Sequence, residues 1–319
     1  MKTVKIPDTD LTLSGIGLGT ALAGIKWSGE EGDRLLETYL EAGGNIIDTA
    51  HVYSDWIPGE IARSERTIGD WIRRRGGKRD DFILMTKGAH PRFESMTTGR
   101  LSKEEVTSDL DSSLEKLGVD YVDVYFYHRD DEARTVEELV ETMEDFKRAG
   151  KIRYYACSNW STARMKEADA YCEKKGYRGF VANQAMYNAG VKYMGTYPDE
   201  TMVICDEEML DYHRNSRNLL IPYMGICGGF FHALEKKGKE AVKDNCFCTE
   251  GNLKVAEGLS KLCKEKGWSM TQALLGFIAS RDFAMVPLAA ASNEKQMEDL
   301  TATLQTDFTE KDYDFFDAL

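Results

Sequence analysis

Phe82-Ile-Leu-Met-Thr-Lys87 is an almost unbroken apolar run that ends in a lysine, and Tyr121-Val-Asp-Val-Tyr-Phe-Tyr-His128 is a second one that ends in a histidine. Neither run shows the regular apolar–polar alternation of a strand that has one face in water. Runs of this kind indicate strands that are buried on both faces, as in a parallel sheet covered by helices. The two stretches therefore predict an α/β fold with polar groups at the ends of its strands.

Six more runs of the same kind recur along the chain, and amphipathic stretches with helical spacing lie between them. They are Leu13–Gly19, Asn45–Ala50, Ile152–Asn159, Phe180–Gln184, Leu219–Met224 and Ala284–Ala289. Eight strand–helix units without a linker rich in Pro or Ser predict one (β/α)8 TIM barrel, a single domain over residues 1–319. A doubly wound parallel sheet is the alternative fold.

Several of the expected helices have recognisable start and stop residues. Ser102-Lys-Glu-Glu105 has the form of a capping box, an apolar stripe follows it, and Gly118 is expected to end the helix. Thr135-Val-Glu-Glu138 and Ser28-Gly-Glu-Glu31 predict two further helix starts of the same form.

Three other segments complete the expected layout. Asp8-Thr-Asp10 lies between two extended pieces and predicts a hairpin ahead of the first barrel strand. About 25 residues after Met224 lack a clear period, which predicts a long loop after strand seven, or a lid over the barrel mouth. Helical stretches are expected again over Leu253–Lys266 and Thr271–Ile278.

Composition narrows the class of protein. The chain of 319 residues has 41 Lys and Arg against 54 Asp and Glu, a formal net charge of −13, and 42% hydrophobic residues. This content predicts a globular protein, and its negative field makes nucleic acids and membrane surfaces poor partners. No apolar run approaches a membrane span, and the N-terminus resembles no signal peptide. We therefore expect a cytoplasmic protein.

Seven scattered cysteines suit a reducing compartment without structural disulfides. Cys246 and Cys248 form a Cys-x-Cys pair, but no second pair or histidine pair accompanies it. A zinc site is therefore not expected, and no metal is assigned.

Four polar side chains follow expected strands at the end where a barrel carries its chemistry. Asp48 and Tyr53 follow the second strand, Lys87 ends the third and His128 ends the fourth. Each has an ordinary alternative, because an Asp can cap a turn, a Tyr can pack at the rim, and a Lys or His can simply be solvated or hydrogen-bonded. Lys87, however, follows five residues of buried strand, and burying it without a carboxylate partner would cost several kcal/mol.

Together the four side chains predict proton transfer from a phenol. A free tyrosine has a pKa of about 10, and an ammonium about 4 Å away would lower it by about 3 units at an effective dielectric of 20. In this arrangement Asp48 holds Lys87, Lys87 tunes Tyr53, and His128 orients a substrate carbonyl. A general acid without a nucleophile or metal implies that the electrons come from a hydride-carrying cofactor.

In order and spacing these residues resemble the catalytic tetrad of the aldo-keto reductases. Gly17-Leu-Gly19-Thr20 is similar to the family's first-strand motif, whose Gly19 and Thr20 are candidate cofactor contacts. Ser158-Asn159 and Asn183-Gln184 are similar to the nicotinamide-binding positions, where the side chains of Ser158, Asn159 and Gln184 would hold the carboxamide. Tyr223 matches the aromatic residue that stacks on the nicotinamide ring. The resemblance covers essentially the whole chain.

The expected adenosine end departs from the family pattern. Gln296 aligns with an arginine that usually clamps the 2′-phosphate, and an amide cannot replace the bidentate charge of a guanidinium. Ser292, Asn293 and Lys295 remain as phosphate ligands, whereas Asp299 would favour a free ribose hydroxyl. Both NADP(H) and NAD(H) are therefore retained as cofactors.

The substrate side is only partly defined by the sequence. Trp56, His90 and Trp160 lie just beyond strand ends and are expected to line the pocket. The polar residues Asp55, Arg129 and Asp130 near the mouth leave a polyhydroxylated substrate as one option beside plain aldehydes and ketones.

The sequence thus predicts an NAD(P)(H)-dependent oxidoreductase that acts on a small carbonyl or alcohol, as a monomer or weak homo-oligomer. Two alternatives stay open. One is a Schiff-base aldolase that uses Lys87, a role in which Ser158, Asn159 and Gln184 have no task. The other is a regulatory subunit that senses a nicotinamide cofactor with little turnover. A metal-dependent hydrolase is the least favoured class, because the histidines have no accompanying carboxylate pattern.

Overall fold

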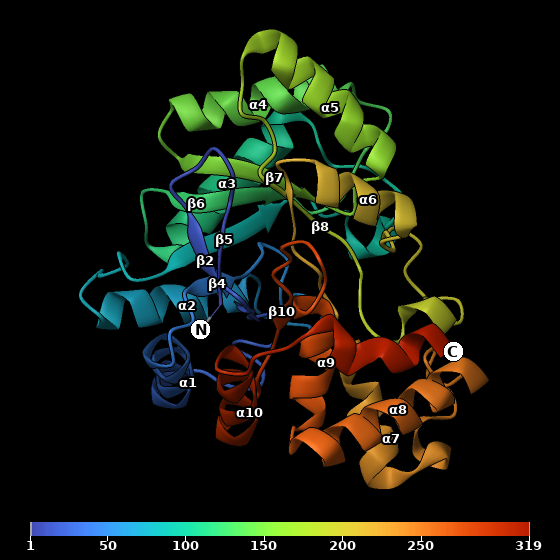
Figure 1. Ribbon diagram of the computed structural model, residues 1–319. Helices are drawn as coiled ribbons and strands as arrows, with labels where there is room; N and C mark the ends of the chain where they lie inside the picture. Colours follow the sequence, from blue (N-terminus) through green and yellow to red (C-terminus); the bar gives the residue numbers. More distant parts are fainter. Residues whose placement is uncertain (1, 319) are drawn as a thin grey trace.

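The computed structural model describes the backbone of residues 2–318, in which eight parallel strands form a barrel surrounded by helices (Figure 1). The strands follow the order β10-β3-β4-β5-β6-β7-β8-β9 around the sheet. Their bounds are β3 Gly17–Gly19, β4 Ile46–Asp48, β5 Ile83–Gly88, β6 Val122–Tyr127, β7 Ile152–Ser158, β8 Ala182–Gln184, β9 Leu219–Leu220 and β10 Leu288–Ala289. All eight lie within one residue of, or inside, the ranges predicted from the sequence.

Hydrogen bonds close the sheet on itself. On one side β10 pairs with β3, with Leu288 opposite Gly17. On the other side Leu220 forms a parallel bridge with Met285, and the amide of Leu288 donates to the carbonyl of Pro222 at 2.8 Å. A doubly wound sheet has two free edges, so this closure excludes the alternative fold and establishes the (β/α)8 barrel.

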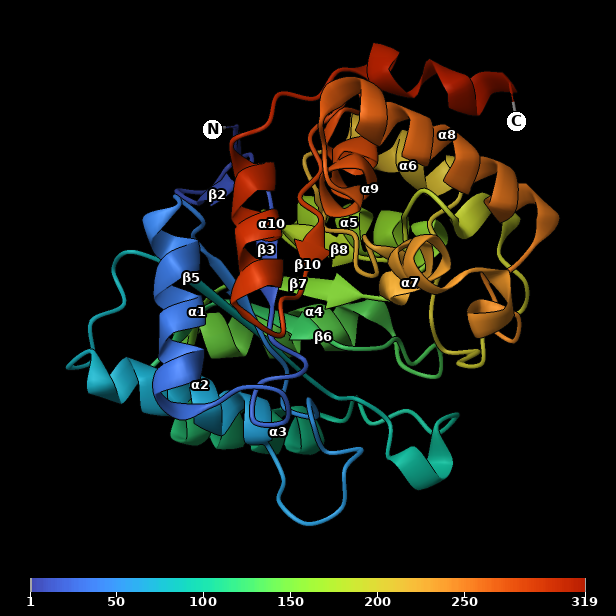
Figure 2. The ribbon, with the colours of Figure 1, turned by 90° about the horizontal axis from the view of Figure 1, so that it is seen from below.

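The helices lie on the outside of the strands, as Figure 2 shows from another side. Their bounds are α1 Gly29–Glu41, α2 Arg63–Arg74, α3 Lys103–Leu117, α4 Val136–Arg148, α5 Thr162–Lys175, α6 Glu207–Asn215, α7 Phe230–Lys237, α8 Glu250–Lys266, α9 Met270–Ala279 and α10 Glu294–Leu304. Short 3-10 turns span Phe93–Ser95, Val191–Tyr193, Cys227–Gly229, Lys239–Val242 and Glu310–Ala318. Among the residues described, no helix is both long and apolar enough to cross a membrane.

The predicted start of α3 is confirmed in detail. Ser102 accepts a hydrogen bond from the amide of Glu105, the Glu105 carboxylate reaches back to the amide of Ser102, and Gly118 ends the helix at φ 68°. The same sequence form at Ser28 begins α1, but the Ser28 side chain forms no cap hydrogen bond within the described structure. Thr135 begins α4 and accepts from the amide of Glu138, so the sequence form located all three helix starts, although the cap bond at Ser28 does not form.

The first predicted strand, Leu13–Gly19, is in fact two strands. Leu13 belongs to β2 (Thr12–Ser14), which pairs with β1 (Thr3–Lys5) in the predicted hairpin, and the barrel strand begins only at Gly17. The chain turns between them, where the Ser14 hydroxyl donates to the carbonyl of Ile16 at 2.8 Å.

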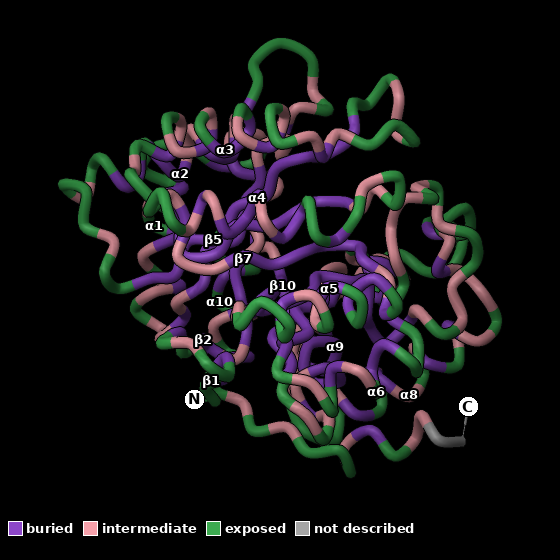
Figure 3. Tube along the Cα trace, turned by 90° about the horizontal axis from the view of Figure 1, so that it is seen from above, coloured by how far each residue is buried: buried purple, intermediate pink, exposed green. Residues whose placement is uncertain are grey.

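Alternation along each strand separates two apolar layers. On β5, Ile83 and Met85 belong to the cluster inside the barrel, and Leu84 belongs to the layer between strands and helices. Lys87 is the next inward residue after Met85, so the same pleat brings it to the carboxyl end of the barrel interior. Nearly all residues of the eight barrel strands are buried, with Gly19, Arg153 and Tyr154 only partly so, which is why the strands lack a polar face (Figure 3).

The long segment after β9 is ordered and contains α7. Phe230, Phe231 and Phe247 of this segment are buried in one apolar cluster, with the rings of Phe230 and Phe247 6.0 Å apart. The expectation of a long connection is confirmed, but it is packed against the barrel by these aromatic side chains.

Candidate active site

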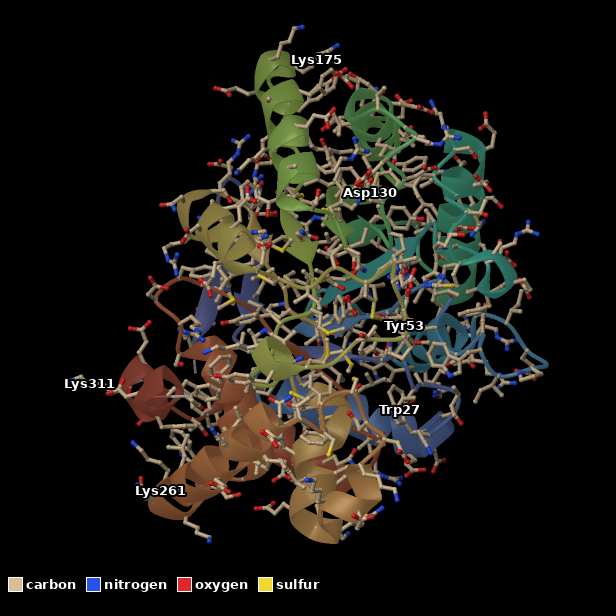
Figure 4. The ribbon with its side chains drawn as sticks, turned by 90° about the vertical axis from the view of Figure 1, so that its right-hand side faces the viewer. Trp27, Tyr53, Asp130, Lys175, Lys261 and Lys311 are labelled. Atoms are coloured by element: carbon tan, nitrogen blue, oxygen red, sulfur yellow. The ribbon has the colours of Figure 1, made fainter. Side chains whose placement is uncertain are left out.

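A cavity of about 1140 Å³ opens at the carboxyl ends of the strands. It exceeds the roughly 300–1,000 Å³ of most small-molecule sites, so it has room for a large cofactor beside a substrate. Figure 4 shows Tyr53, which lines this cavity, in the middle of the molecule, whereas Lys175, Lys261 and Lys311 extend from its outer surface.

The four predicted catalytic side chains meet at the floor of this cavity. Asp48, Tyr53 and His128 line it, and Lys87 lies beneath them with 1% of its surface exposed. The Lys87 Nζ donates to Asp48 Oδ2 at 2.6 Å, to the carbonyl oxygen of Thr49 at 2.8 Å and to the hydroxyl of Tyr53 at 3.1 Å. These contacts account for all three N–H bonds of the ammonium group.

Burial raises the pKa of Tyr53 above its ordinary value of 10, because the nearby Lys87 offsets only part of the desolvation of a phenolate. The predicted lowering by about 3 units is therefore wrong for the net shift, although Lys87 acts in the expected direction. Burial would lower the pKa of Lys87, but Asp48 and Tyr53 outweigh it and the pKa rises. The resting site thus holds a neutral phenol, a charged ammonium and a carboxylate.

Two neutral histidines lie beside the phenol, His128 next to Tyr53 and His90 behind His128. Burial lowers the pKa of His128 well below its ordinary value and that of His90 to about 4. The His128 ring lies 5.7 Å from the Tyr53 ring and 4.8 Å from the His90 ring, edge to face in both cases. Within the described structure the Nδ1 of His128 has no hydrogen-bond partner, so Nδ1 is the better place for the lone pair, with the proton on Nε2.

The residues expected at the nicotinamide form one hydrogen-bonded group along the cavity wall. Gln184 Nε2 donates to Asp48 Oδ1 at 2.8 Å, and the Ser158 hydroxyl donates to the carbonyl of Gln184 at 3.0 Å. Asn159 Nδ2 donates to Ser158 Oγ at 2.9 Å, and its Oδ1 accepts from the hydroxyl of Tyr223 at 2.7 Å. Gly19 also lines the cavity here.

The opposite end of the cavity lies between α10 and α7. Ser292, Gln296 and Asp299 line it as expected. Gln296 Oε1 already accepts from the amide of Ser292 at 2.7 Å, which ties the side chain to the helix start. From α7, His232 and Lys236 line the same end, one helical turn apart. Sequence reasoning missed both, because nothing in an eight-residue helix marks the face that it turns inward.

Four expected contacts are not brought to the cavity, and one of them is Lys295, an exposed residue in the first turn of α10 that is absent from the cavity lining. The Thr20 hydroxyl is buried below it, donating to the carbonyl of Asp48 at 2.9 Å. Asn293 caps α10 by accepting from the amide of Gln296 at 3.0 Å, and it does not line the cavity. Trp160, expected in the substrate pocket, is fully buried and stacked on Tyr127 with the ring centres 6.1 Å apart.

The substrate end has a mainly apolar wall. Trp56 and His90 line it as expected, together with Val52, Phe93 and Met96. The polar residues that favoured a polyhydroxylated substrate are engaged elsewhere. Asp130 pairs with Arg164 at 2.9 Å, Asp55 accepts from the amide of Ala62 at 2.6 Å, and Arg129 is bonded to the loop of residues 198–203. The loop was not anticipated as part of the site, because its contacts with the barrel are remote in sequence.

Known proteins similar to this chain agree with the geometry. The Aldo/keto reductase family pattern matches residues 15–319. The chain is 34% identical over 233 residues to the aldo-keto reductase YhdN of Bacillus subtilis, which covers 72% of this chain and 63% of YhdN. It is 24% identical over 295 residues to norsolorinic acid reductase B of Dothistroma septosporum, which covers 89% of this chain and 70% of the relative. An aryl-alcohol dehydrogenase of Pestalotiopsis microspora is 26% identical over 333 residues, 97% of this chain and 81% of its own. The match spans nearly the whole chain, which therefore belongs to the aldo/keto reductase family of oxidoreductases.

Proposed function

We propose that this protein transfers hydride between a nicotinamide cofactor and a carbonyl or alcohol substrate, with Tyr53 as the general acid or base. The observation that carries the proposal is the direction of the Lys87 hydrogen bonds. One N–H of the buried ammonium points at the phenol oxygen of Tyr53 at 3.1 Å, and another is held by Asp48 at 2.6 Å. This is the arrangement that stabilises negative charge on a phenol.

The hydrogen-bond roles define the proton path. Because Tyr53 accepts from Lys87, its own proton is free to point into the cavity and pass to a substrate oxygen. The bound nicotinamide would supply or receive the hydride. As the proton leaves, Lys87 stabilises the phenolate, and Asp48 keeps the ammonium charged and aimed. The neutral His128, with its proton on Nε2, is suited to donate a hydrogen bond to the same oxygen.

The residues present suit a nicotinamide nucleotide. Ser158, Asn159 and Gln184 present a hydroxyl and two amides, which complement the donors and acceptors of a carboxamide. In this structure they bond to one another and to Asp48, and Asn159 also bonds to Tyr223, Val203 and His128, so binding would exchange some of these contacts for contacts with the carboxamide.

The adenosine end offers one cation and one anion. Among residues 2–316, whose side chains the structure describes, Lys236 forms no ion pair, while Asp299 presents a carboxylate to the same end of the cavity. A carboxylate can accept a hydrogen bond from a free ribose hydroxyl, as in NAD(H), and an ammonium attracts a 2′-phosphate, as in NADP(H). Both nucleotides remain part of the proposal, and the Lys236 ammonium is the group that would bind the 2′-phosphate of NADP(H).

We further propose an aromatic aldehyde or ketone, or the matching alcohol, as the substrate class. The wall formed by Trp56, Phe93 and Met96 is apolar, and aromatic side chains favour contact with flat rings. The relative from Pestalotiopsis microspora is named an aryl-alcohol dehydrogenase, which agrees with this choice.

A Schiff-base mechanism through Lys87 fits the site less well. An amine that attacks a carbonyl must first be neutral, but the pKa of Lys87 is raised, although its burial opposes this. All three of its N–H bonds are engaged, and Thr49 takes one through its carbonyl oxygen. The amine is therefore neither neutral nor free.

Substitution of the phenol tests the proposal. Tyr53→Phe removes only the hydroxyl, and we expect it to reduce kcat for aromatic aldehydes by about 10²–10⁴-fold. NADH or NADPH should still quench tryptophan fluorescence with nearly unchanged affinity, because Trp56 reports on the cavity and the phenol is not needed for binding. Tyr154→Phe, which removes a hydroxyl bonded to Asp10 of the N-terminal hairpin and does not line the cavity, is the matched control. Full turnover in Tyr53→Phe would refute the mechanism, and failure of the wild type to bind either nucleotide would refute the function.

A further inference from the structure

Arg129 follows the proposed catalytic His128 directly and is one of the most engaged side chains in the cavity wall. It is 4% exposed, and its guanidinium makes three separate hydrogen bonds. Nη1 donates to the carbonyl of His128 at 2.9 Å, Nε donates to Thr201 Oγ1 at 2.7 Å, and Nη2 donates to Asp199 Oδ2 at 3.0 Å. One side chain therefore joins the end of β6 to a loop about 70 residues further along the chain.

The loop that Arg129 contacts, residues 198–203, connects β8 to α6. Its residues 198–202 line the cavity. Asp199 braces the loop from within, because its Oδ1 accepts from both the amide and the hydroxyl of Thr201, at 2.9 and 2.6 Å. One oxygen of the Asp199 carboxylate therefore stabilises the turn of the loop, and the other accepts from Arg129.

A second attachment lies at the other end of the loop. The amide of Val203 donates to Asn159 Oδ1 at 3.0 Å, and Asn159 Nδ2 donates to the carbonyl of His128 at 3.2 Å. The carbonyl oxygen of His128 therefore accepts from Arg129 and from Asn159, and both donors also hold the loop. The carbonyl oxygen of His128 therefore couples the position of His128 to the position of the loop of residues 198–203.

We propose that Arg129 is a positioning residue that fixes the loop of residues 198–203 as a wall of the substrate end and holds His128 opposite Tyr53. The inference rests on the proposed function, because it assigns the wall to the substrate of that reaction. Arg129 is not assigned a contact with the reacting atoms. Its three bonds are directed at protein groups, and Asp199 compensates its charge.

The chemistry of the contact explains why an arginine is placed here. A guanidinium offers five N–H donors in one plane, so it reaches a carbonyl, a hydroxyl and a carboxylate at once. A lysine keeps the charge but offers a single nitrogen, which cannot span three acceptors on two segments. Removing either Arg129 or Asp199 leaves the other charge without its partner in a poorly hydrated position, which pushes the loop away from the barrel.

Loss of this attachment has a defined effect on substrate choice. With the wall in place, a small aromatic aldehyde is held between the loop and the apolar side formed by Trp56 and Phe93. With the wall released, the small substrate loses contacts that hold it near Tyr53, while a bulkier ring system gains room. Arg129 thereby becomes a determinant of the size of the carbonyl compound that reacts.

The test compares benzaldehyde with a naphthaldehyde in steady-state kinetics. For Arg129→Met we expect KM for benzaldehyde to rise at least tenfold, with a smaller loss of kcat, and the preference for benzaldehyde over the naphthaldehyde to fall at least fivefold. Arg129→Lys should recover part of the preference, because it restores the charge opposite Asp199. Asp199→Asn changes a partly exposed loop rather than the barrel, and it should shift the preference in the same direction.

Arg164→Met is the matched control, since Arg164 also holds a partly buried ion pair, with Asp130, but does not line the cavity. It should leave the preference unchanged. Equal effects of Arg164→Met and Arg129→Met, or an unchanged preference in both Arg129→Met and Asp199→Asn, would overturn the inference. If the wild type reduces no aldehyde of a wider panel with either nucleotide, the proposed function fails instead, which is a separate result.

Discussion

Lys87 illustrates how burial and pairing together set the chemistry of a single side chain. At about 4 Å and an effective dielectric of 20, two unit charges interact by about 4 kcal/mol, which is large enough to control a protonation state. For Lys87 the interactions with Asp48 and Tyr53 outweigh the effect of burial, so its pKa rises and the ammonium stays charged. For Tyr53 the effect of burial outweighs the interaction with Lys87, so its pKa rises and the phenol stays neutral. The difference arises because Lys87 has a carboxylate beside it, whereas Tyr53 has a single cation that is already shared with Asp48.

These directions predict different pH dependences for reduction and for oxidation. Reduction needs the protonated phenol, whose pKa lies above 10, so kcat/KM for an aldehyde should stay flat between pH 6 and 9. Oxidation needs the phenolate, whose fraction rises about tenfold per pH unit below the pKa, so kcat/KM for the alcohol should climb across the same range. Steady-state pH profiles in both directions measure this. Reduction that falls tenfold between pH 7 and 8 would contradict the raised pKa.

At the scale of single residues, the sequence predicted those site residues that lie on the strands or directly after them. Asp48, Lys87 and His128 are all inward residues at strand ends, and a pleat of period two places such residues on one floor. Arg129 and Lys236 could not be assigned, because their positions depend on a loop and a helix whose packing no local pattern specifies. Trp160 shows the reverse error, since a position just after a strand does not say whether a large ring faces the cavity or the helices.

Helix starts show what a local pattern can and cannot establish at the scale of an element. A Ser or Thr followed three residues later by Glu correctly marks where α1 and α3 begin. Whether the side chain then bonds to the backbone depends on its rotamer and on the chain before it. Ser102 makes the bond and Ser28 does not, although both precede a helix with the same motif.

This contrast gives a matched pair of substitutions. Ser102→Ala removes a cap that accepts from the amide of Glu105, and we expect it to lower the free energy of unfolding by about 1 kcal/mol. Ser28→Ala removes a hydroxyl with no cap bond, so we expect a change of only a few tenths of a kcal/mol. Urea unfolding followed by circular dichroism measures both. Equal losses in the two variants would show that the cap bond itself does not matter here.

The segment after β9 marks the limit of periodicity as a guide. α7 has eight residues, about two turns, which is too short for an apolar stripe to stand out from its surroundings. Its place is decided by tertiary contacts, because Phe230 and Phe231 bury against the α8 and α9 region. Those contacts turn His232 and Lys236 toward the cavity, so the helix contributes to the site through packing that only the fold reveals.

At the scale of the whole molecule, the barrel was predictable because its evidence is distributed. Each of the eight short buried runs is weak evidence alone. Eight of them in regular alternation with helices favour one (β/α)8 barrel over a doubly wound sheet or two domains. The cavity lining runs from Gly19 to Leu300, so both halves of the chain contribute to one site. We infer from this that the chain acts as one unit, as the absence of a linker suggested.

Charge also acts at this scale. The formal net charge is −13, and the cavity wall adds Asp48, Asp199, Glu200 and Asp299 against Arg129 and Lys236. A nucleotide with an extra 2′-phosphate therefore enters a negative field, and any preference for it must come from a local cation. Arg129 is paired with Asp199, which leaves Lys236 among the described lining residues.

Ligand-linked stability tests this balance in the intact protein. A nucleotide that binds only the folded chain at 100 times its Kd stabilises it by about 2.7 kcal/mol. With an unfolding entropy of about 2.1 cal/mol/K per residue, 319 residues should then show a rise in Tm of about 4 °C.

We expect NADH to raise Tm at least as much as NADPH at equal concentration. Lys236→Met should reduce the NADPH shift and leave the NADH shift unchanged, because an exposed ammonium contributes up to about 1 kcal/mol to phosphate binding. Lys237→Met, its neighbour outside the cavity lining, is the control. If Lys236→Met leaves the NADPH shift intact, Lys236 does not bind the 2′-phosphate, and the negative field of the barrel must be overcome by other groups of the lining, such as the Ser292 hydroxyl.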